Sequence, residues 1–173
     1  AAEFDSNGLL WNITSFVERP LKSYDPISGS WQSYNFSALI ENPSDENGFF
    51  DMEIDRNGTK WIGAYNNGLI AFNENETPAI KNITEERQGL PTEVIRSLAV
   101  DNSGQLWIGT RNGLRVLFNT SGFFEDEDGF NNPELICLTF IWTFTGLLPL
   151  AGSDAVLVDA AVVDDDKEQL MYL

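Results

Sequence analysis

An aspartate, a glycine and a tryptophan recur at the same relative spacing three times along the chain. The sets are Asp5-Gly8-Trp11, Asp55-Gly58-Trp61 and Asp101-Gly104-Trp107, and successive aspartates lie 50 and 46 residues apart. A repeat of this length is typical of stacked architectures, and a propeller blade takes about 40 to 50 residues. The sequence therefore predicts an all-β fold: a partial β-propeller of about three four-stranded antiparallel blades, followed by an irregular acidic and apolar C-terminal segment.

Each motif lies where a tight turn joins two predicted strands. Asp, Asn and Gly tolerate the left-handed backbone of such turns, and runs rich in β-branched and long aliphatic residues flank them. In the middle repeat, strands are expected at 49–55, 59–65 and 69–72, with a fourth, outer strand at 78–84. The first repeat keeps the end of an inner strand at 2–5 and has later strands at 21–24 and 31–36, and the third has strands at 94–100, 105–110 and 114–118.

The repeats divide the chain into blades near 1–48, 49–93 and 94–119 and an atypical segment at 120–173, in which Lys167 is the single basic residue. Residues 163–172 can be aligned with the third repeat, so a degenerate fourth blade stands beside a truncated or frame-altered end as an alternative. Propellers typically need 4 to 8 blades to close. Three blades imply either a piece of a larger protein or copies that assemble to complete the ring.

The charged residues of the chain exclude some classes of partner and of catalytic site. With 27 acidic residues, 10 basic residues and no histidine, the net charge is −17, which would repel a phosphate backbone, so no nucleic acid is expected. Without histidine there is no Ser-His-Asp or Cys-His arrangement and no His-ligated zinc. Asp-x-Asn-Gly at Asp5 and Asp55 lacks the distal Glu of a calcium loop and is interpreted as a turn. We expect no enzyme activity, catalytic residue, cofactor or metal site, although the acidic run 125–128 leaves a cation site as an alternative to a solvated loop.

An uncharged stretch of 19 residues, from Leu135 to Ser153, approaches the length of a membrane helix. Pro149 and two glycines interrupt it, and its flanks are acidic where basic anchors would be expected. Two buried strands, at 135–145 and 155–163, are therefore favoured and a membrane span is not expected. The lone Cys137 is interpreted as a buried, inert thiol.

The repeated tryptophans allow two interpretations. An exposed indole could stack on a carbohydrate, whereas an indole at a fixed place on the second strand of every repeat would pack one blade on the next. The constant position favours packing between blades.

The stretch Asp101-x-x-Gly-x-Leu-Trp-Ile-Gly-Thr-x-x-Gly-Leu, with a similar stretch from Asp55, closely resembles the two-component regulator propeller repeat. Gly89-Leu90-Pro91 is similar to the loop before the inner strand in that family. The resemblance covers about residues 1–119, although Asn12-Ile13-Thr14-Ser15 departs from the pattern. Such repeats build the periplasmic sensor halves of hybrid histidine kinases in Bacteroidetes, which respond to glycans. They also build PorZ-like surface proteins that are tied to type IX secretion and linked to anionic lipopolysaccharide.

The resemblance implies a non-enzymatic recognition or scaffold module in the periplasm or at the cell surface. In a propeller, the loops after the second strands and before the inner strands share one face, the usual ligand face. The candidate binding residues there, for a glycan or an anionic lipopolysaccharide, are Tyr65, Asn66, Asn67, Arg87, Arg111 and Asn112. The alternative is a structural assembly module without a small ligand, whose exposed blade edges pair with another chain or with copies of itself. A protein partner or the remaining blades would then close the propeller.

Overall fold

Antiparallel sheets dominate the structure. The computed structural model describes residues 1–40, 48–88 and 90–125. Within these ranges lie three sheets and one four-residue helix, α2 (Glu85–Gln88), and the strands of each sheet follow one another in chain order. The prediction of an all-β fold with antiparallel blades is confirmed.

Each sheet is one blade. Blade 1 consists of β1 (Ala2–Phe4), β2 (Leu10–Ile13), β3 (Leu21–Asp25) and β4 (Ser30–Tyr34). Blade 2 consists of β5 (Phe49–Ile54), β6 (Lys60–Ala64), β7 (Leu69–Phe72) and β8 (Ile80–Ile83). Blade 3 consists of β9 (Ile95–Val100), β10 (Leu106–Thr110) and β11 (Gly113–Leu117). The outer strand predicted at 78–84 is present as β8, and blade 3 has three strands within the described residues.

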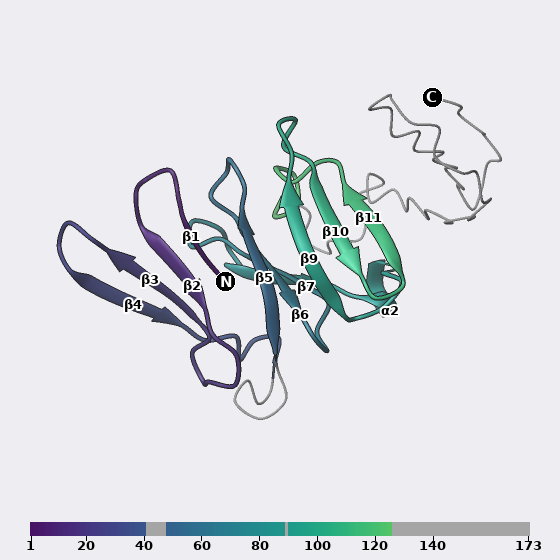
Figure 1. Cartoon of the computed structure of the whole chain (residues 1–173), viewed down its shortest axis with the longest axis horizontal. Coiled ribbons are helices and arrows are strands. Elements are labelled where there is room, and N and C mark those ends of the chain that lie inside the picture. Colours follow the sequence, from purple (N-terminus) through teal and green to yellow (C-terminus); the bar gives the residue numbers. More distant parts are fainter. Residues whose placement is uncertain (41–47, 89, 126–173) are drawn as a thin grey trace, which may run out of the picture.

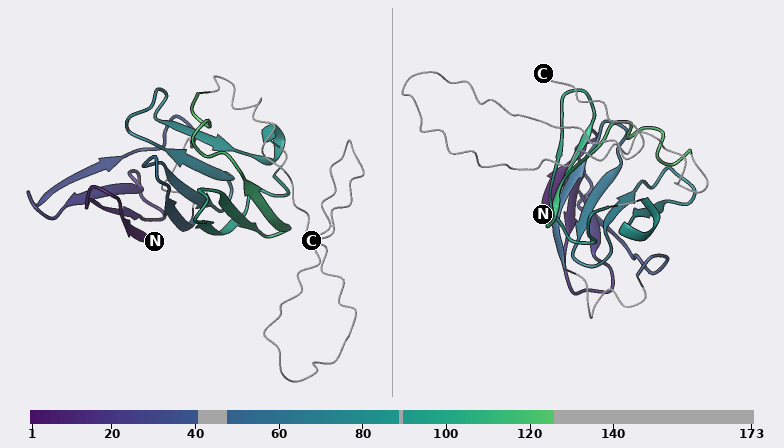
Figure 2. Two further views of the ribbon diagram at one scale, coloured as in Figure 1. Left: turned by 90° about the horizontal axis from the view of Figure 1, so that it is seen from above. Right: turned by 90° about the vertical axis from the view of Figure 1, so that its right-hand side faces the viewer.

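The blades stand side by side in chain order, from the purple β1–β4 to the green β9–β11 (Figure 1). The view from above keeps the same order (Figure 2). The first strands of successive blades are neighbours, because β1 contacts β5 and β5 contacts β9. This is the arrangement of consecutive propeller blades, in which the first strand of each blade is the innermost.

Blade 2 is buried on both faces because it lies between its two neighbours. Side chains alternate between the faces of a strand, so Ile62 and Ile70 join the core shared with blade 1. Trp61 and Leu69, one residue earlier on the same strands, join the core shared with blade 3. Every residue of β6 is consequently buried, so the strand does not show the alternation of buried and exposed residues that a sheet with one solvated face would have.

The glycine of each motif has the same backbone conformation. Gly8, Gly58 and Gly104 have φ angles of 81°, 78° and 84°, in the left-handed region that glycine adopts without a steric penalty. In the middle turn, the Gly58 amide donates to the Asp55 carbonyl at 3.0 Å. The spacing of Asp and Gly therefore reflects the geometry of the turn.

Several expectations fall outside the described residues. They are the degenerate fourth blade, the strands at 135–145 and 155–163, the Cys137 thiol and most of the acidic run 125–128. None of the helices in the described ranges is long and apolar enough to cross a membrane.

Candidate functional site

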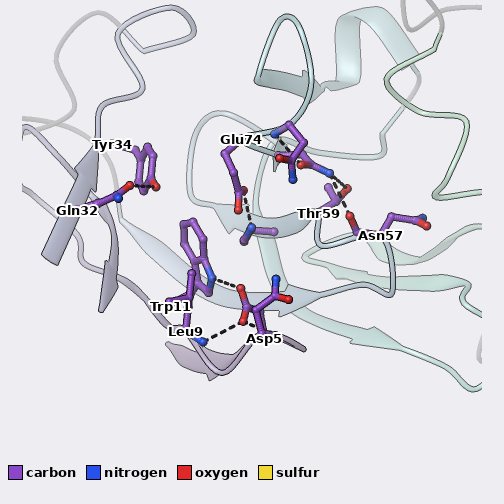
Figure 3. A network of polar contacts seen from close by, with 12 residues as sticks. Asp5, Leu9, Trp11, Gln32, Tyr34, Asn57, Thr59 and Glu74 are labelled. Atoms are coloured by element: carbon purple, nitrogen blue, oxygen red, sulfur yellow. Dashed lines mark hydrogen bonds and ion pairs between the residues drawn. The ribbon is translucent and has the colours of Figure 1, made fainter. Parts of the chain in front are cut away.

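The aspartate of each motif holds the indole of the tryptophan six residues later. In the middle repeat, Asp55 Oδ1 accepts the amides of Asn57 and Thr59 at 2.9 and 3.0 Å, and Asp55 Oδ2 accepts Trp61 Nε1 at 2.9 Å. Figure 3 shows the first repeat, where Asp5 joins the Trp11 indole and the Leu9 amide, each at 2.9 Å. One carboxylate thus closes the turn and fixes the orientation of the indole.

The third repeat has the same arrangement. Asp101 Oδ2 accepts Trp107 Nε1 at 3.0 Å, and Asp101 Oδ1 accepts the amides of Ser103 and Gln105. The hydrogen bond from the Trp107 indole is the main reason that the pKa of Asp101 lies below its ordinary value, followed by that from the Gln105 amide.

Two of these tryptophans pack between blades and do not face solvent. Trp11 and Trp61 are completely buried, in the cores between blades 1 and 2 and between blades 2 and 3. The interpretation as blade packing is confirmed for both residues. Trp107 is half-buried on the face of blade 3 that points away from blade 2. The indoles of Trp11 and Trp61 are therefore not available to stack on a carbohydrate.

Most of the predicted site residues lie at one end of the blades. Asn66 and Asn67 form the β6–β7 turn, and Arg111 and Asn112 form the β10–β11 turn, with Tyr65 directly after β6. The segment that precedes β9 lies beside both turns, because the Gly68 amide donates to the Glu93 carbonyl at 3.1 Å and Asn112 Nδ2 donates to the Pro91 carbonyl at 3.2 Å. The helix α2, which contains Arg87, leads into this segment.

At this end of the blades, Phe50 and Tyr65 form an exposed aromatic pair, and the positive charge of Arg96 lies beside it. Their ring centroids are 5.8 Å apart, and each residue is 41% exposed. The guanidinium carbon of Arg96 lies 4.5 Å from the Phe50 centroid and 5.9 Å from the Tyr65 centroid, within the range of cation–π contacts. Phe50 and Tyr65 belong to blade 2 and Arg96 to blade 3. We call these three residues the aromatic-arginine cluster.

Blade 1 adds a third aromatic side chain beside the cluster. A Cβ atom placed on Gly48 would lie 3.9 Å from Phe16 Cζ and 3.9 Å from Tyr65 Cβ, so the two aromatic residues flank the same glycine. Phe16 is 62% exposed and has a left-handed φ of 59°, which is rare for a bulky residue. The neighbouring Ser15 Oγ accepts the Phe49 amide at 2.8 Å and ties this loop to β5.

Arg96 supplies a cation without a nearby acidic partner. Among the described residues, no carboxylate lies within 4.0 Å of its guanidinium. Within the described residues, an ion pair is formed by Lys60 and Glu74, and it lies between blades 1 and 2. The described ranges hold no group of side chains suited to a metal ion. The chemistry on offer is therefore aromatic stacking beside a positive charge that can bind an acidic group.

Tyr65 is the predicted residue that the structure brings into the cluster, and Phe50, Arg96 and Phe16 were missed. Phe49 and Phe50 are adjacent in β5, but blade 2 is packed on both faces, so the alternation along the strand did not mark Phe50 as exposed. Arg96 follows the buried Ile95 in β9. No periodicity in the sequence indicates that two strands of different blades bring Phe50 and Arg96 together.

The repeated turn, the pinned indole and the stacked sheets define a β-propeller repeat protein. The resemblance drawn from the sequence is confirmed, since residues 89–112 match the family described as "Two component regulator propeller". A protein similar in sequence is histidine kinase P4 of Formosa agariphila, 34% identical over 111 residues, which are 62% of this chain and 8% of the kinase.

Solved structures with the same fold include a bacterial surface component and the extracellular domain of a two component system. PorZ of Porphyromonas gingivalis, described as an essential surface component of the type-IX secretion system, gives a TM-score of 0.60 at 25% identity over 73% of this chain and 19% of PorZ. The extracellular domain of BT3049 from B. thetaiotaomicron, assigned to a hybrid two component system, gives 0.54 at 24% identity over 70% of this chain and 15% of that domain. The chain thus spans less than a fifth of each of these proteins.

Proposed function

We propose that this chain is a non-enzymatic recognition module that acts outside the cytoplasm and binds an acidic glycan at the end of its blades. The observation that carries the proposal is the aromatic-arginine cluster, in which two half-exposed rings and one unpaired cation meet across a blade junction. The similarity to PorZ and to the extracellular domain of a hybrid two component system supports a place in the periplasm or at the cell surface.

The chemistry of the cluster fits a sugar that bears a negative charge. Exposed aromatic rings offer flat apolar surfaces with little conformational entropy to lose, and a sugar ring can lie on them through its C–H face. The Arg96 guanidinium can donate two parallel hydrogen bonds to a carboxylate, sulfate or phosphate. A cation is favourable here also because the chain as a whole has a net charge of −17 and would otherwise repel an acidic ligand. Asn66 and Asn67 of the adjacent turn are our candidates for further polar contacts with the sugar.

Dextran and dextran sulfate make a matched pair of probes, because they share one glucan backbone and differ in charge. We expect dextran sulfate to bind more tightly than dextran, and Arg96→Ala to weaken the binding about tenfold or more, since a hydrogen bond to a charged group contributes about 1.5–3 kcal/mol. Phe50→Ala should weaken the binding of both dextran and dextran sulfate. Isothermal titration calorimetry on the full chain measures each affinity, and purified lipopolysaccharide is the third probe.

Arg56→Ala is the control variant, because Arg56 lies in the turn at the opposite end of β5 from Phe50. Its binding of dextran sulfate should equal that of the unchanged chain. Equal binding by Arg96→Ala, Phe50→Ala and the unchanged chain would exclude the cluster as the site. Release of reducing ends from any of these polysaccharides would contradict a non-enzymatic role.

The second candidate function, structural assembly through uncovered blade surfaces, is favoured by a different observation. Phe4 and Trp31 of blade 1 are 62% and 61% exposed on the side of the sheet that points away from blade 2. Large exposed apolar side chains gathered on one face often mark an interaction site. Solution size separates this function from ligand binding.

A further inference from the structure

Phe16 is a bulky apolar residue at a position where the other two blades have asparagine. It lies 11 residues after the aspartate of its motif, as Asn66 and Asn112 do after theirs. All three belong to the connection between the second and third strands of a blade, and these connections lie at one end of the blades (Figure 1). A departure from the repeat at such a position calls for a structural or a functional reason.

Core packing does not account for the phenylalanine. Phe16 is 62% exposed, and it is the non-glycine residue with a left-handed φ, of 59°, within residues 1–40, 48–88 and 90–125. Asparagine adopts this conformation more readily, because its short polar side chain can form local hydrogen bonds. Blade 1 therefore keeps an exposed ring in a strained conformation that asparagine would relieve. Backbone strain of this kind is concentrated at functional sites.

The connection that carries Phe16 is tied to blade 2, so the ring has a defined place. Ser15 Oγ accepts the Phe49 amide at 2.8 Å, and the Tyr65 amide donates to the Gly48 carbonyl at 2.9 Å. Phe16 Cζ and Tyr65 Cβ flank Gly48, each 3.9 Å from a Cβ atom placed there. A surface that is ordered before the ligand arrives loses less conformational entropy on binding.

Phe16 extends the aromatic-arginine cluster into a row across three blades. Phe16 belongs to blade 1 and Arg96 to blade 3, and the Phe50 and Tyr65 rings of blade 2 lie between them. Neighbouring sheets pack about 10 Å apart, and a sugar ring is about as wide as a single phenyl ring. One sugar unit is therefore too small to contact both Arg96 and Phe16, whereas a chain of several units can.

The two ends of this row differ in charge. Arg96 has no carboxylate within 4.0 Å among the described residues, so its end of the row selects an acidic group. The connection of Phe16 holds one acidic and one basic residue, Glu18 and Arg19, which are both exposed. Their charges balance, so the Phe16 end offers an aromatic surface to a sugar unit whether or not that unit is charged.

We propose that Phe16 is a second sugar subsite, and that the chain binds a stretch of several units of an acidic polysaccharide across its three blades. The acidic unit lies at Arg96, and a unit further along the polysaccharide lies on Phe16. This subsite rests on the proposed function, because it requires a glycan at the aromatic-arginine cluster. The length of the glycan then determines affinity in addition to its charge, since the linked units bind as one ligand.

Sulfated isomaltose and sulfated isomalto-octaose are the probes, because they share the dextran backbone and differ in length. NMR titration of the isotopically labelled full chain measures affinities as weak as millimolar. We expect the octasaccharide to bind more tightly. Phe16→Asn should weaken its binding about three- to tenfold, the contribution of one aromatic contact, and leave the binding of the disaccharide unchanged. Phe16→Tyr keeps a ring and should bind like the unchanged chain.

Phe16→Asn also separates a binding role from a packing role. It introduces the residue that the other two blades have at this position, so the urea midpoint should stay the same or rise. Ile27→Asn is the matched control, because Ile27 is 95% exposed in the turn that lies at the other end of β3. This control should bind both probes like the unchanged chain.

The variants distinguish failure of the second subsite from failure of the proposed function. No binding of either probe, or equal binding of the octasaccharide by Arg96→Ala and the unchanged chain, contradicts both. If Arg96→Ala weakens the binding of the octasaccharide and Phe16→Asn does not, the acidic-glycan site remains and the second subsite is excluded. The second subsite is likewise excluded if Phe16→Asn weakens both probes equally or lowers the urea midpoint.

Discussion

Lys60 lies over the ring of Trp11, with its ammonium 3.8 Å from the ring centroid, although only 1% of Lys60 is exposed. The same nitrogen donates to Glu74 Oε2 at 2.6 Å. Trp11 belongs to blade 1 and the other two residues to blade 2, so a buried charge closes this junction. In the next junction the equivalent of Lys60 is Leu106, beside Trp61. The fold therefore accepts a cation or an apolar chain at the same position.

This comparison predicts the effects of two substitutions of Lys60. We expect Lys60→Leu to change the free energy of unfolding by about 1.5 kcal/mol or less, since leucine fills the same position in blade 3 and Glu74 can turn toward water. Lys60→Ala should cost about 2–4 kcal/mol, because it leaves a cavity beside the indole. Urea denaturation measures both. Equal destabilisation by the two variants would show that the charge, and not the packing, holds the junction.

The loss of stability on removing the carboxylate that orients an indole should depend on how deeply that carboxylate is buried. Asp55 is 5% exposed and accepts three hydrogen bonds, so Asp55→Ala leaves buried donors unpaired and should cost about 3 kcal/mol or more. Asp101→Ala removes the same set of bonds at a half-buried position and should cost clearly less. Urea denaturation and tryptophan fluorescence test the pair. A larger loss from Asp101→Ala would contradict this account.

Two glycines with similar backbone angles should respond very differently to alanine. Gly68 has a φ of 66°, and a Cβ atom there would lie 2.1 Å from the Ile83 carbonyl oxygen, which cannot move without breaking the β7–β8 pairing. Gly58 has a φ of 78° and no heavy atom within 4 Å of such a Cβ. Gly58→Ala should therefore cost only the left-handed penalty of about 1–2 kcal/mol, and Gly68→Ala considerably more. Similar thermal midpoints for the two variants would rule out the close approach.

The inner strands should give the protein an unusual dependence on pH. Burial, and then repulsion by Glu53, raises the pKa of Glu3 above its ordinary value of 4.5, and burial followed by repulsion from Asp51 raises that of Glu53. A raised pKa means that the folded state binds more protons than the unfolded state between 4.5 and the folded value. These two groups therefore make the protein more stable as the pH falls toward 4.5.

Glu3→Gln with Glu53→Gln should remove this contribution, so that the double variant is more stable than the unchanged chain near pH 7 and loses part of the gain on acidification. Urea midpoints between about pH 4.5 and 7.5 provide the measurement. The opposite sign applies to Asp25 and Asp101, whose pKa values are lowered from 3.8, so their contribution is lost only below that pH. If the urea midpoint of the double variant changes with pH in the same way as that of the unchanged chain, the two glutamates do not cause the pH dependence.

Local chemistry made most of the blades predictable. Asp55, Gly58 and Trp61 are bonded to one another or to residues between them, so their spacing alone indicates a turn followed by a strand. The outer strand at 78–84 was predicted from its composition and its position in the repeat, and it is present as β8. The burial of Trp11 and Trp61 followed from their constant place in the repeats. The aromatic-arginine cluster was harder to predict from the sequence. Only one of its three residues, Tyr65, lies beside a turn that the repeat itself defines.

The sequence by itself determined the turns, the order of strands within each blade and the tryptophan that each blade presents, because those features depend on residues within about ten positions of one another. The tertiary structure decided which surfaces meet. Phe50 and Arg96 are distant in sequence and contact each other because β5 and β9 are neighbouring inner strands. Lys60 is buried because blade 1 packs on it. Contacts between blades depend on the stacking of whole sheets, which no short-range pattern encodes.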